Sequence, residues 1–412
     1  MLTTEQEQAV NFIADNIEDK KLIALEGMAG TGKTSCIKAL VEKLSPKQRV
    51  CVSATTNKAA QVLRQKELDD AVTVYQAAMA PEFRPPYDKL GAFLEQGRFL
   101  KDCKPEYPRQ LVNQFTQEAL EKALKSVDEN GIYSGFRALG IKDFMKYVDG
   151  WKPMGTQVGF LIVDEASMLG DRELATIREC FSKIILIGDD FQLPPINSER
   201  VFLNVPDRAK LTVIHRQAAD SQPLRIAMQA RSKKSPDFGA KSAIDPELAQ
   251  QATPVIVWTN KTRMQVTQGI RQRLGIGGKS PQVGEMLICR NTSDKIAKGQ
   301  GLINNTLWRV IESDGFVCTL ENDQGQVLEE ISIYSEELEK GDGIPFRFGY
   351  ALTCHQAQGS EWDQAMVHVP DYLAYHSMCF RRGTDDAYRW IYTAVTRAKE
   401  RVIGVTGVVA ER

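Results

Sequence analysis

The stretch LIALEGMAGTGKTSCIKALVEKL, residues 22–44, decides the fold class of this chain. It opens with a short apolar run, continues with the glycine-rich loop GMAGTGKT at 27–34, and ends with a helical pattern. A loop of this composition between a strand and a helix is the setting of a phosphate-binding loop. Its glycines let backbone N–H groups wrap phosphate oxygens, and the N-terminus of the following helix favours negative charge. The stretch therefore predicts a nucleotide-binding α/β fold.

Two side chains of the loop carry specific expectations. Lys33 is predicted to reach the β and γ phosphates of ATP, and Thr34 to bind Mg²⁺. A chance glycine-rich turn is the alternative, and the flanking strand and helix patterns argue against it. The residues predicted to contact the nucleotide here are Gly27, Gly30, Thr31, Gly32, Lys33 and Thr34.

Further apolar runs, rich in valine, isoleucine and leucine, alternate with helical patterns along the chain. Continuous apolar strands of this kind are typical of a parallel sheet covered by helices on both faces. Four runs precede residue 200 and three follow it, which predicts two doubly wound sheets. The runs are 22–27, 49–55, 160–166, 183–189, 255–259, 365–369 and 401–405.

Each predicted sheet is interrupted by an insertion. The first, 81–157, begins with the proline-rich PEFRPPYDK and has a helical pattern at 108–127. It is interpreted either as a surface decoration or as an element that helps to separate strands. The second insertion, 276–349, alternates apolar and polar residues between turn sequences, which predicts a small antiparallel barrel.

The composition argues against a membrane protein, a secreted protein and a protein with a structural metal. The chain has 412 residues, enough for two to four domains, and its 52 Lys and Arg nearly balance its 53 Asp and Glu. A nucleic-acid-binding surface would therefore have to be local. No apolar run approaches the length of a membrane span and no secretion signal is evident, so a cytoplasmic protein is expected. Its eight cysteines and four histidines lack metal-ligand spacing, which argues for reduced thiols and against a structural metal.

Two adjacent carboxylates stand at the end of a predicted buried strand, in LIVDEASML. Such a pair is costly to bury unless a metal or a reaction needs it. Asp164 is predicted to hold Mg²⁺, and Glu165 to orient and polarise the attacking water, because phosphoryl transfer depends on positioning and charge stabilisation.

The next predicted strand ends in GDDFQLPPI, which offers the amide of Gln192 at the carboxyl edge of the sheet. Open α/β sheets bind ligands at that edge. Two interpretations remain open for this residue. It senses the γ-phosphate, or it is a turn residue that stabilises the Pro194–Pro195 corner.

With these motifs the chain resembles superfamily 1 helicases, in particular superfamily 1B, the branch that contains RecD and the phage Dda helicase. The resemblance covers nearly the whole chain, through LTTEQEQAV, GDDFQLPP, LTVIHRQ, YALTCHQAQGSEWD and IYTAVTRAKERVIGV. It implies two RecA-like domains, a mainly helical inserted subdomain and an SH3-like barrel. The implied boundaries are 1–80 with 158–205 for the first RecA-like domain, 81–157 for the subdomain, 206–275 with 350–412 for the second RecA-like domain, and 276–349 for the barrel.

The resemblance also implies roles at the nucleotide. Gln6 would contact adenine, although a plain capping box at a helix start would be compatible with the same sequence. Arg216 and Arg397 occupy the positions of two arginine fingers, and Gly359 and Glu361 would lie near the ribose. An arginine reaching across a domain cleft can neutralise the charge that phosphoryl transfer spreads over the equatorial oxygens.

Contacts to a single strand are expected at SATTNKAA, residues 53–60, which offers hydroxyls, an amide and a lysine at a helix N-terminus. The resemblance implies Thr55, Asn57 and Lys58 there, with Thr353 and His355 as partners from the second domain. The family usually has a histidine where this chain has Tyr75, in TVYQAA at 73–78. A tyrosine can stack on a base instead.

The predicted function is an ATP-dependent DNA helicase that moves 5′ to 3′ along one strand. The direction rests on GDDFQLPP and QGSEW resembling the RecD and Dda branch, and on the small size of the second insertion. A nucleotide-dependent switch or clamp without unwinding, or a helicase acting on RNA as well, are the alternatives. Expected partners are single-stranded DNA, junctions with duplex, and replication, repair or recombination proteins. The chain is expected to act as a monomer in a bacterial or phage-infected cell, away from membranes.

Overall fold

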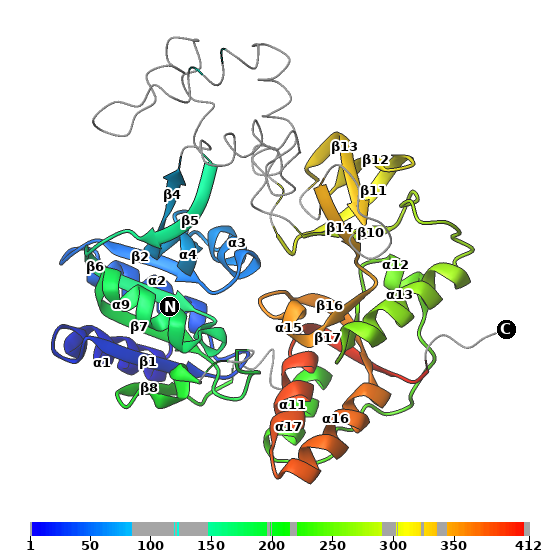
Figure 1. Cartoon of the computed structure of the whole chain (residues 1–412). Helices are drawn as coiled ribbons and strands as arrows, with labels where there is room; N and C mark the ends of the chain where they lie inside the picture. Colours follow the sequence, from blue (N-terminus) through cyan, green and yellow to red (C-terminus); the bar gives the residue numbers. More distant parts are fainter. Residues whose placement is uncertain are drawn as a thin grey trace. The chain divides into compact units, whose positions relative to one another are not determined.

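The computed structural model describes residues 2–84, 119, 122, 147–195, 198, 200–214, 221–290, 302, 304–322, 325–335 and 344–407. Two compact units contain these residues: Met1–Ala77 with Thr156–Arg412, and Ala78–Gly155. The larger unit holds two parallel sheets and a closed barrel (Figure 1). We call residues 2–77 and 156–211 the first lobe, and residues 221–274 and 349–407 the second lobe.

The sheet of the first lobe has six parallel strands among the described residues, in the order β3–β2–β6–β7–β1–β8. Four of them confirm the apolar runs predicted as strands before residue 200. The short edge strands β3 and β8 were not predicted. Because β8 pairs with β1, this sheet extends beyond the boundary predicted at residue 205. The strands are β1 (Leu22–Gly27), β2 (Val50–Ala54), β3 (Val72–Thr73), β6 (Gln157–Asp164), β7 (Phe181–Gly188) and β8 (Arg208–Leu211).

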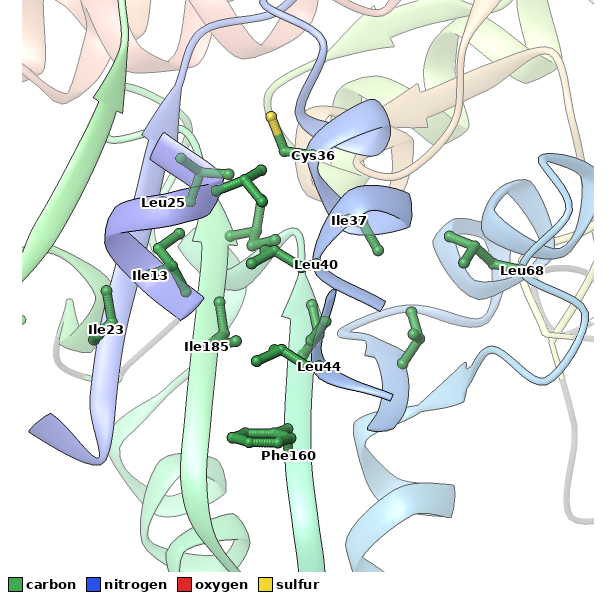
Figure 2. Packing of buried hydrophobic residues seen from close by; sticks show 14 of the residues in the cluster. Ile13, Ile23, Leu25, Cys36, Ile37, Leu40, Leu44, Leu68, Phe160 and Ile185 are labelled. Carbon is green, nitrogen blue, oxygen red and sulfur yellow. The ribbon is translucent and has the colours of Figure 1, made fainter. Parts of the chain in front are cut away.

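Helices α1 (Thr4–Lys20), α2 (Lys33–Leu44) and α3 (Asn57–Gln65) pack on one face of this sheet. Alternate strand residues such as Ile23, Leu25 and Ile185 point into the same cluster, as a period of two requires (Figure 2). The intervening strand residues are buried as well, and α9 (Asp171–Cys180) packs beside β7. Burial on both sides explains why the strands read as continuous apolar runs. The short elements of this lobe are α4 (Val74–Ala78), η1 (Ala166–Met168) and η2 (Val201–Asn204).

The second lobe contains a parallel sheet in the order β15–β9–β16–β17 within the described ranges. The three apolar runs after residue 200 correspond to β9 (Val255–Val257), β16 (Trp362–His368) and β17 (Ala398–Val405). The fourth strand, β15 (Ala351–Thr353), lies inside the motif predicted to bind DNA. Its helices are α11 (Gln222–Arg231), α12 (Pro246–Gln250), α13 (Asn260–Arg273), α15 (Cys354–Ala357), α16 (Val369–Arg382) and α17 (Asp386–Val395).

A closed five-stranded barrel interrupts the second lobe, as the alternating pattern predicted. Its first four strands pair antiparallel in chain order, but β14 pairs parallel to β13 and antiparallel to β10. The expectation of a purely antiparallel barrel is corrected here, because a parallel neighbour needs a longer connection than a tight hairpin. The strands are β10 (Met286–Cys289), β11 (Leu307–Asp314), β12 (Val317–Glu321), β13 (Val327–Ser335) and β14 (Ile344–Phe348).

In the smaller unit, β4 (Met79–Arg84) and β5 (Tyr147–Pro153) pair antiparallel, with Met79 opposite Pro153. The helical pattern predicted at 108–127 lies outside the described residues, apart from Ala119 and Lys122, which are helical.

The structure also bears on the state of the cysteines and on membrane-spanning helices. The seven cysteines that the structure describes carry no disulfide, and all but Cys51 are buried. Among the described helices none is both long and apolar enough to cross a membrane.

Candidate functional site

The phosphate-binding loop connects β1 to α2 in a shape that only its glycines permit. Gly30 and Gly32 have φ angles of 82° and 81°, in the left-handed region that strains other residues. A Cβ atom on Gly27 would lie 2.6 Å from the Thr31 hydroxyl oxygen. The glycine pattern in the sequence is therefore explained by the geometry of the loop.

Lys33 is the first residue of α2, and its side chain curls over the loop. Its ammonium group donates to the carbonyl oxygens of Gly27, at 2.9 Å, and Met28, at 3.0 Å. Thr34 follows in the first turn of the same helix and is half-buried. The loop thus gathers a cation, a hydroxyl and a helix N-terminus, which are the groups that bind phosphates.

Asp164 and Glu165 lie at the carboxyl end of β6, as the sequence predicted for the strand. Glu165 has a φ of 53°, an unusual left-handed conformation for a residue with a side chain, and its N–H donates to Asp164 Oδ1 at 2.9 Å. Burial, together with the neighbouring Glu165 carboxylate, raises the pKa of Asp164 to about 6. Strained backbone and adjacent half-buried acids are features that functional sites retain.

Three buried polar atoms at this sheet edge have no hydrogen-bond partner among the described residues: Glu165 Oε2, Ser167 Oγ and Gln192 Oε1. Buried polar atoms are rarely left unsatisfied in a protein, so each of them is available to a ligand. The motifs that carry them pack together, since a Cβ on Gly188 would lie 3.0 Å from the Ser167 nitrogen. Sequence reasoning did not single out Ser167, because a serine after DEA has no distinctive spacing.

Gln6 forms the capping box that is one of its two predicted interpretations. Its amide oxygen accepts from the N–H of Thr3, and the Thr3 side chain accepts from the N–H of Gln6, so the pair is a capping box at the start of α1. Its amide nitrogen also donates to the carbonyl oxygen of Thr31 at 2.9 Å. Gln6 therefore lies against the phosphate loop, and the adenine contact stays a prediction.

Of the two predicted arginine fingers, the structure describes only Arg397. Arg216 lies outside the described residues. Arg397 is buried in the second lobe, where it donates to the carbonyl oxygens of Thr393 and Ser360 and to the hydroxyl of Thr396. A finger role would require its guanidinium group to exchange some of these acceptors for phosphate oxygens.

Gly359 and Glu361, the two residues predicted to lie near the ribose, have different surroundings in the structure. Gly359 has a φ of 76°, and a Cβ there would lie 2.6 Å from the Thr56 hydroxyl oxygen, so the second lobe approaches α3 closely at this point. Glu361 is exposed and lines a cavity of about 200 Å³. Within the described residues no hydrogen bond or ion pair joins Glu361 to the phosphate loop.

The residues predicted to contact DNA from the first lobe gather at the start of α3. Thr55 follows β2, and its hydroxyl donates to the carbonyl oxygen of Glu165 at 3.1 Å, so this predicted contact is tied to the acidic motif. Asn57 begins α3, and Lys58 lines the 200 Å³ cavity. Tyr75, on α4, has 57% of its surface exposed, which suits a stacking partner.

Thr353 and His355 stand where β15 gives way to α15. Thr353 is buried, and its N–H donates to the amide oxygen of Gln356 at 3.1 Å. Burial lowers the pKa of His355, so its ring is neutral near pH 7. As long as no phosphate lies beside it, the ring can therefore contribute a hydrogen bond but no charge.

The cavity contains a concentration of positive charge that the overall composition conceals. It is bordered by α13, by barrel strands and by the β15–α15 segment. Sequence reasoning missed it because its basic residues are far apart in the chain. They are Lys58, Arg263, Arg290, Arg309 and Arg347, and they outnumber the two acidic residues of the lining, Glu321 and Glu361.

Comparisons with known proteins match both lobes of the chain to nucleotide-binding and helicase families. The family profile described as AAA domain matches residues 1–245, and that of the UvrD-like helicase C-terminal domain matches residues 348–405. The ATP-dependent RecD2 DNA helicase of Deinococcus radiodurans is 27% identical over 270 residues, which cover 58% of this chain and 35% of that protein. The chain thus spans about a third of the length of this curated relative.

Solved Pif1 helicases share the fold. The Bacteroides enzyme in complex with ADP-AlF3 and single-stranded DNA superposes with a TM-score of 0.52 at 19% identity, covering 98% of this chain and 92% of that one. A Pif1 structure described as a basis for unwinding of forked duplex DNA gives 0.51 at 19%, with the same coverage. Since the AAA-domain profile alone matches more than half of the chain, the protein belongs to that family.

Proposed function

We propose that this protein is an ATP-dependent DNA helicase that moves 5′ to 3′ along single-stranded DNA. The observation that carries the proposal is the set of unpartnered polar atoms of Glu165, Ser167 and Gln192, within the described residues, beside a phosphate-binding loop. The relationship to a curated ATP-dependent DNA helicase supports the same reaction. The solved Pif1 relative bound to single-stranded DNA supports the same partner.

The nucleotide would bind with its phosphates against the N–H groups of the glycine-rich loop. Lys33 would turn from the loop carbonyls to the β and γ phosphates, a small rotation for a flexible side chain. Thr34 and Asp164 would hold Mg²⁺, which neutralises charge on the phosphates when it is bound. Gln192 would contact the γ-phosphate, and Arg216 and Arg397 would approach from the second lobe.

Glu165 would accept a hydrogen bond from the attacking water and hold that water in line with the γ-phosphate. Its left-handed backbone conformation turns the side chain away from the strand direction, and its Oε2 atom has no competing partner among the described residues. A group held ready in this way needs no rearrangement at the moment of reaction.

The DNA strand would follow the start of α3 and the cationic cavity. Lys58 lines this cavity together with four arginines, and phosphate contacts from such groups are independent of sequence. We propose that the barrel is SH3-like and that the insertion at 81–157 helps to separate the strands. We also propose two RecA-like domains with the predicted boundaries, except that β8 extends the first one to residue 211.

The decisive experiment is an unwinding assay on duplexes with either a 5′ or a 3′ single-stranded tail, in DNA and RNA versions. We expect ATP-dependent strand release from the 5′-tailed DNA duplex. Release from the 3′-tailed duplex alone would overturn the direction. ATP turnover that rises with single-stranded DNA but never releases a strand would favour a clamp or switch.

The substitution Glu165→Gln is expected to lower ATP turnover by about 10²–10⁴-fold, the contribution of a positioned general base. Binding of ATP should persist, because the amide fills the same space and phosphate contacts come from the loop. Steady-state turnover and nucleotide titration measure the two effects. Glu179→Gln, on the exposed side of α9, is the matched control. Turnover within twofold of the parent in Glu165→Gln would exclude this role.

A further inference from the structure

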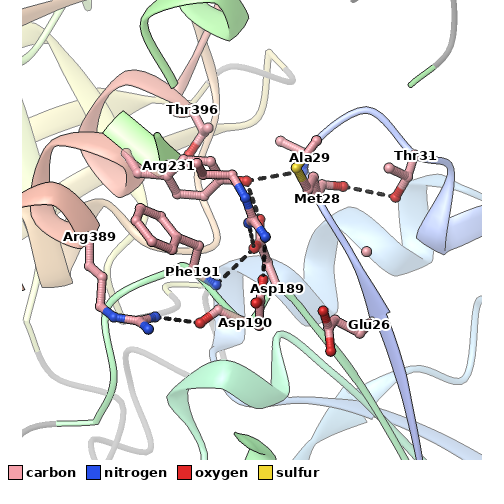
Figure 3. A network of polar contacts seen from close by, with 12 residues as sticks. Glu26, Met28, Ala29, Thr31, Asp189, Asp190, Phe191, Arg231, Arg389 and Thr396 are labelled. Atoms are coloured by element: carbon pink, nitrogen blue, oxygen red, sulfur yellow. Dashed lines mark hydrogen bonds and ion pairs between the residues drawn. The ribbon is translucent and has the colours of Figure 1, made fainter. Parts of the chain in front are cut away.

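The segment Asp189–Leu193 follows β7 in the first lobe, yet its partners lie in the second lobe. Asp189 is completely buried. One carboxylate oxygen accepts from Arg231 at 3.1 Å (Figure 3). The other accepts from the hydroxyl of Tyr392. Arg231 ends α11, and Tyr392 lies on α17. Both side chains that donate hydrogen bonds to this buried carboxylate therefore come from across the boundary between the lobes.

The next two residues are held in the same way. Asp190 accepts from Arg231 at 2.8 Å through its carboxylate, and from Arg389 through its carbonyl oxygen. Both guanidinium groups also lie near the ring of Phe191, with that of Arg231 5.0 Å and that of Arg389 4.9 Å from the ring centroid. The Tyr392 ring meets Phe191 edge-on, with centroids 5.3 Å apart. Ion pairs, cation–π contacts and an aromatic contact thus hold this segment against α11 and α17.

Gln192 is the exception within the segment. Its neighbour Leu193 is fixed through the backbone, donating to the Thr393 hydroxyl at 2.9 Å and accepting from the Gln358 amide at 3.3 Å. The Gln192 side-chain oxygen, however, has no partner among the described residues. Second-lobe side chains hold the residues on both sides of Gln192, and its own amide oxygen is left for a ligand.

The Tyr392 hydroxyl also reaches the phosphate loop, where it accepts from the N–H of Ala29 at 3.5 Å. Burial, reinforced by the Asp189 carboxylate, raises the pKa of Tyr392 well above its usual value. The hydroxyl therefore keeps its proton and donates a hydrogen bond to Asp189. One oxygen atom of the second lobe thus contacts both the loop and the segment that carries Gln192.

We propose that Arg231 and Tyr392 are positioning residues that, through Asp189, make the placement of Gln192 against the γ-phosphate depend on the position of the second lobe. The proposal rests on the proposed ATP-driven function and names the residues that couple its two halves. Separating Asp189 from both partners would leave its buried carboxylate with only the Phe191 N–H and the charge of Lys33 to stabilise it, which is unfavourable. The segment and the second lobe should consequently move together, and Gln192 with them.

The first test uses binding alone. In the parent, ATPγS should bind more tightly than ADP, because Gln192 contacts the γ-phosphate. Tyr392→Phe keeps the ring against Phe191 and removes only the hydroxyl, and Arg231→Gln removes the charge. Both are expected to reduce the ratio of the ADP to the ATPγS dissociation constant about fivefold or more. Arg225→Gln, at an exposed position of the same helix, is the control and should keep the ratio.

The second test asks whether the two residues act through Gln192. Each of Tyr392→Phe and Arg231→Gln should lower DNA-stimulated turnover at saturating ATP by about tenfold, but by less than about threefold when Gln192→Ala is already present. A merely structural role would instead multiply the two losses. Unchanged nucleotide discrimination in Tyr392→Phe, or multiplied losses, would overturn the inference. A parent that discriminates between the nucleotides but shows no DNA-stimulated turnover would overturn the proposed function, and the binding ratios of the variants would then decide the inference.

Discussion

Arg216→Ala is expected to lower ATP turnover by about 10³-fold or more, the scale on which arginine fingers act, and to affect ATP affinity much less. Arg397→Ala should match it in turnover, because both guanidinium groups are predicted to neutralise charge that develops only in the transition state. Steady-state kinetics and nucleotide titration, with and without single-stranded DNA, measure both quantities.

The two variants should differ in stability. Arg397 satisfies the carbonyl oxygens of Thr393 and Ser360 inside the second lobe, so its loss should also cost about 1–3 kcal/mol in free energy of unfolding. Thermal melting tests this, with Arg401→Ala as a control at an exposed position of β17. If ATP affinity collapsed while turnover at saturation survived, the finger assignment would be wrong for that residue.

The second large effect is expected at the phosphate loop. Lys33→Ala should lower ATP turnover and DNA unwinding by about 10²–10³-fold or more, because the ammonium group is the cation that the loop places against the phosphates. The fold should persist, since the contacts of Lys33 are to loop carbonyl oxygens that water can also satisfy.

Lys38→Ala is the matched control for this substitution. Lys38 lies on the same helix and pairs with the exposed Glu67 at the surface, so its removal should leave turnover unchanged. A Lys33→Ala protein whose turnover stays within twofold of the parent would show that the nucleotide site lies elsewhere.

The sequence predicted the long strands and the phosphate loop because their signals are local. A continuous apolar run or a glycine-rich turn is complete within a dozen residues. Strand β8 gave no such signal: Arg208–Leu211 is a four-residue edge strand that alternates polar and apolar residues. Strand β3 has two residues, too few for any periodicity.

Contacts between residues that are far apart in the chain could not be predicted from the sequence. The partners Asp189 and Tyr392 are 203 positions apart, and Asp189 and Arg231 are 42 apart. Arg397 was predicted from its motif, but its burial was not, because arginine is seldom buried unless it is paired. The cationic cavity likewise combines residues between 58 and 347. Only the folded chain brings these groups together.

The antiparallel pairing of β4 with β5 has a consequence for how this chain can vary. Because Met79 lies opposite Pro153, the chain leaves and rejoins the larger unit through a paired stem. The entropic cost of closing a loop, expressed as a free energy, rises by only about 0.6 kcal/mol for each doubling of the loop length. A segment grafted onto such a stem can therefore be lengthened, shortened or exchanged at little cost to the host fold.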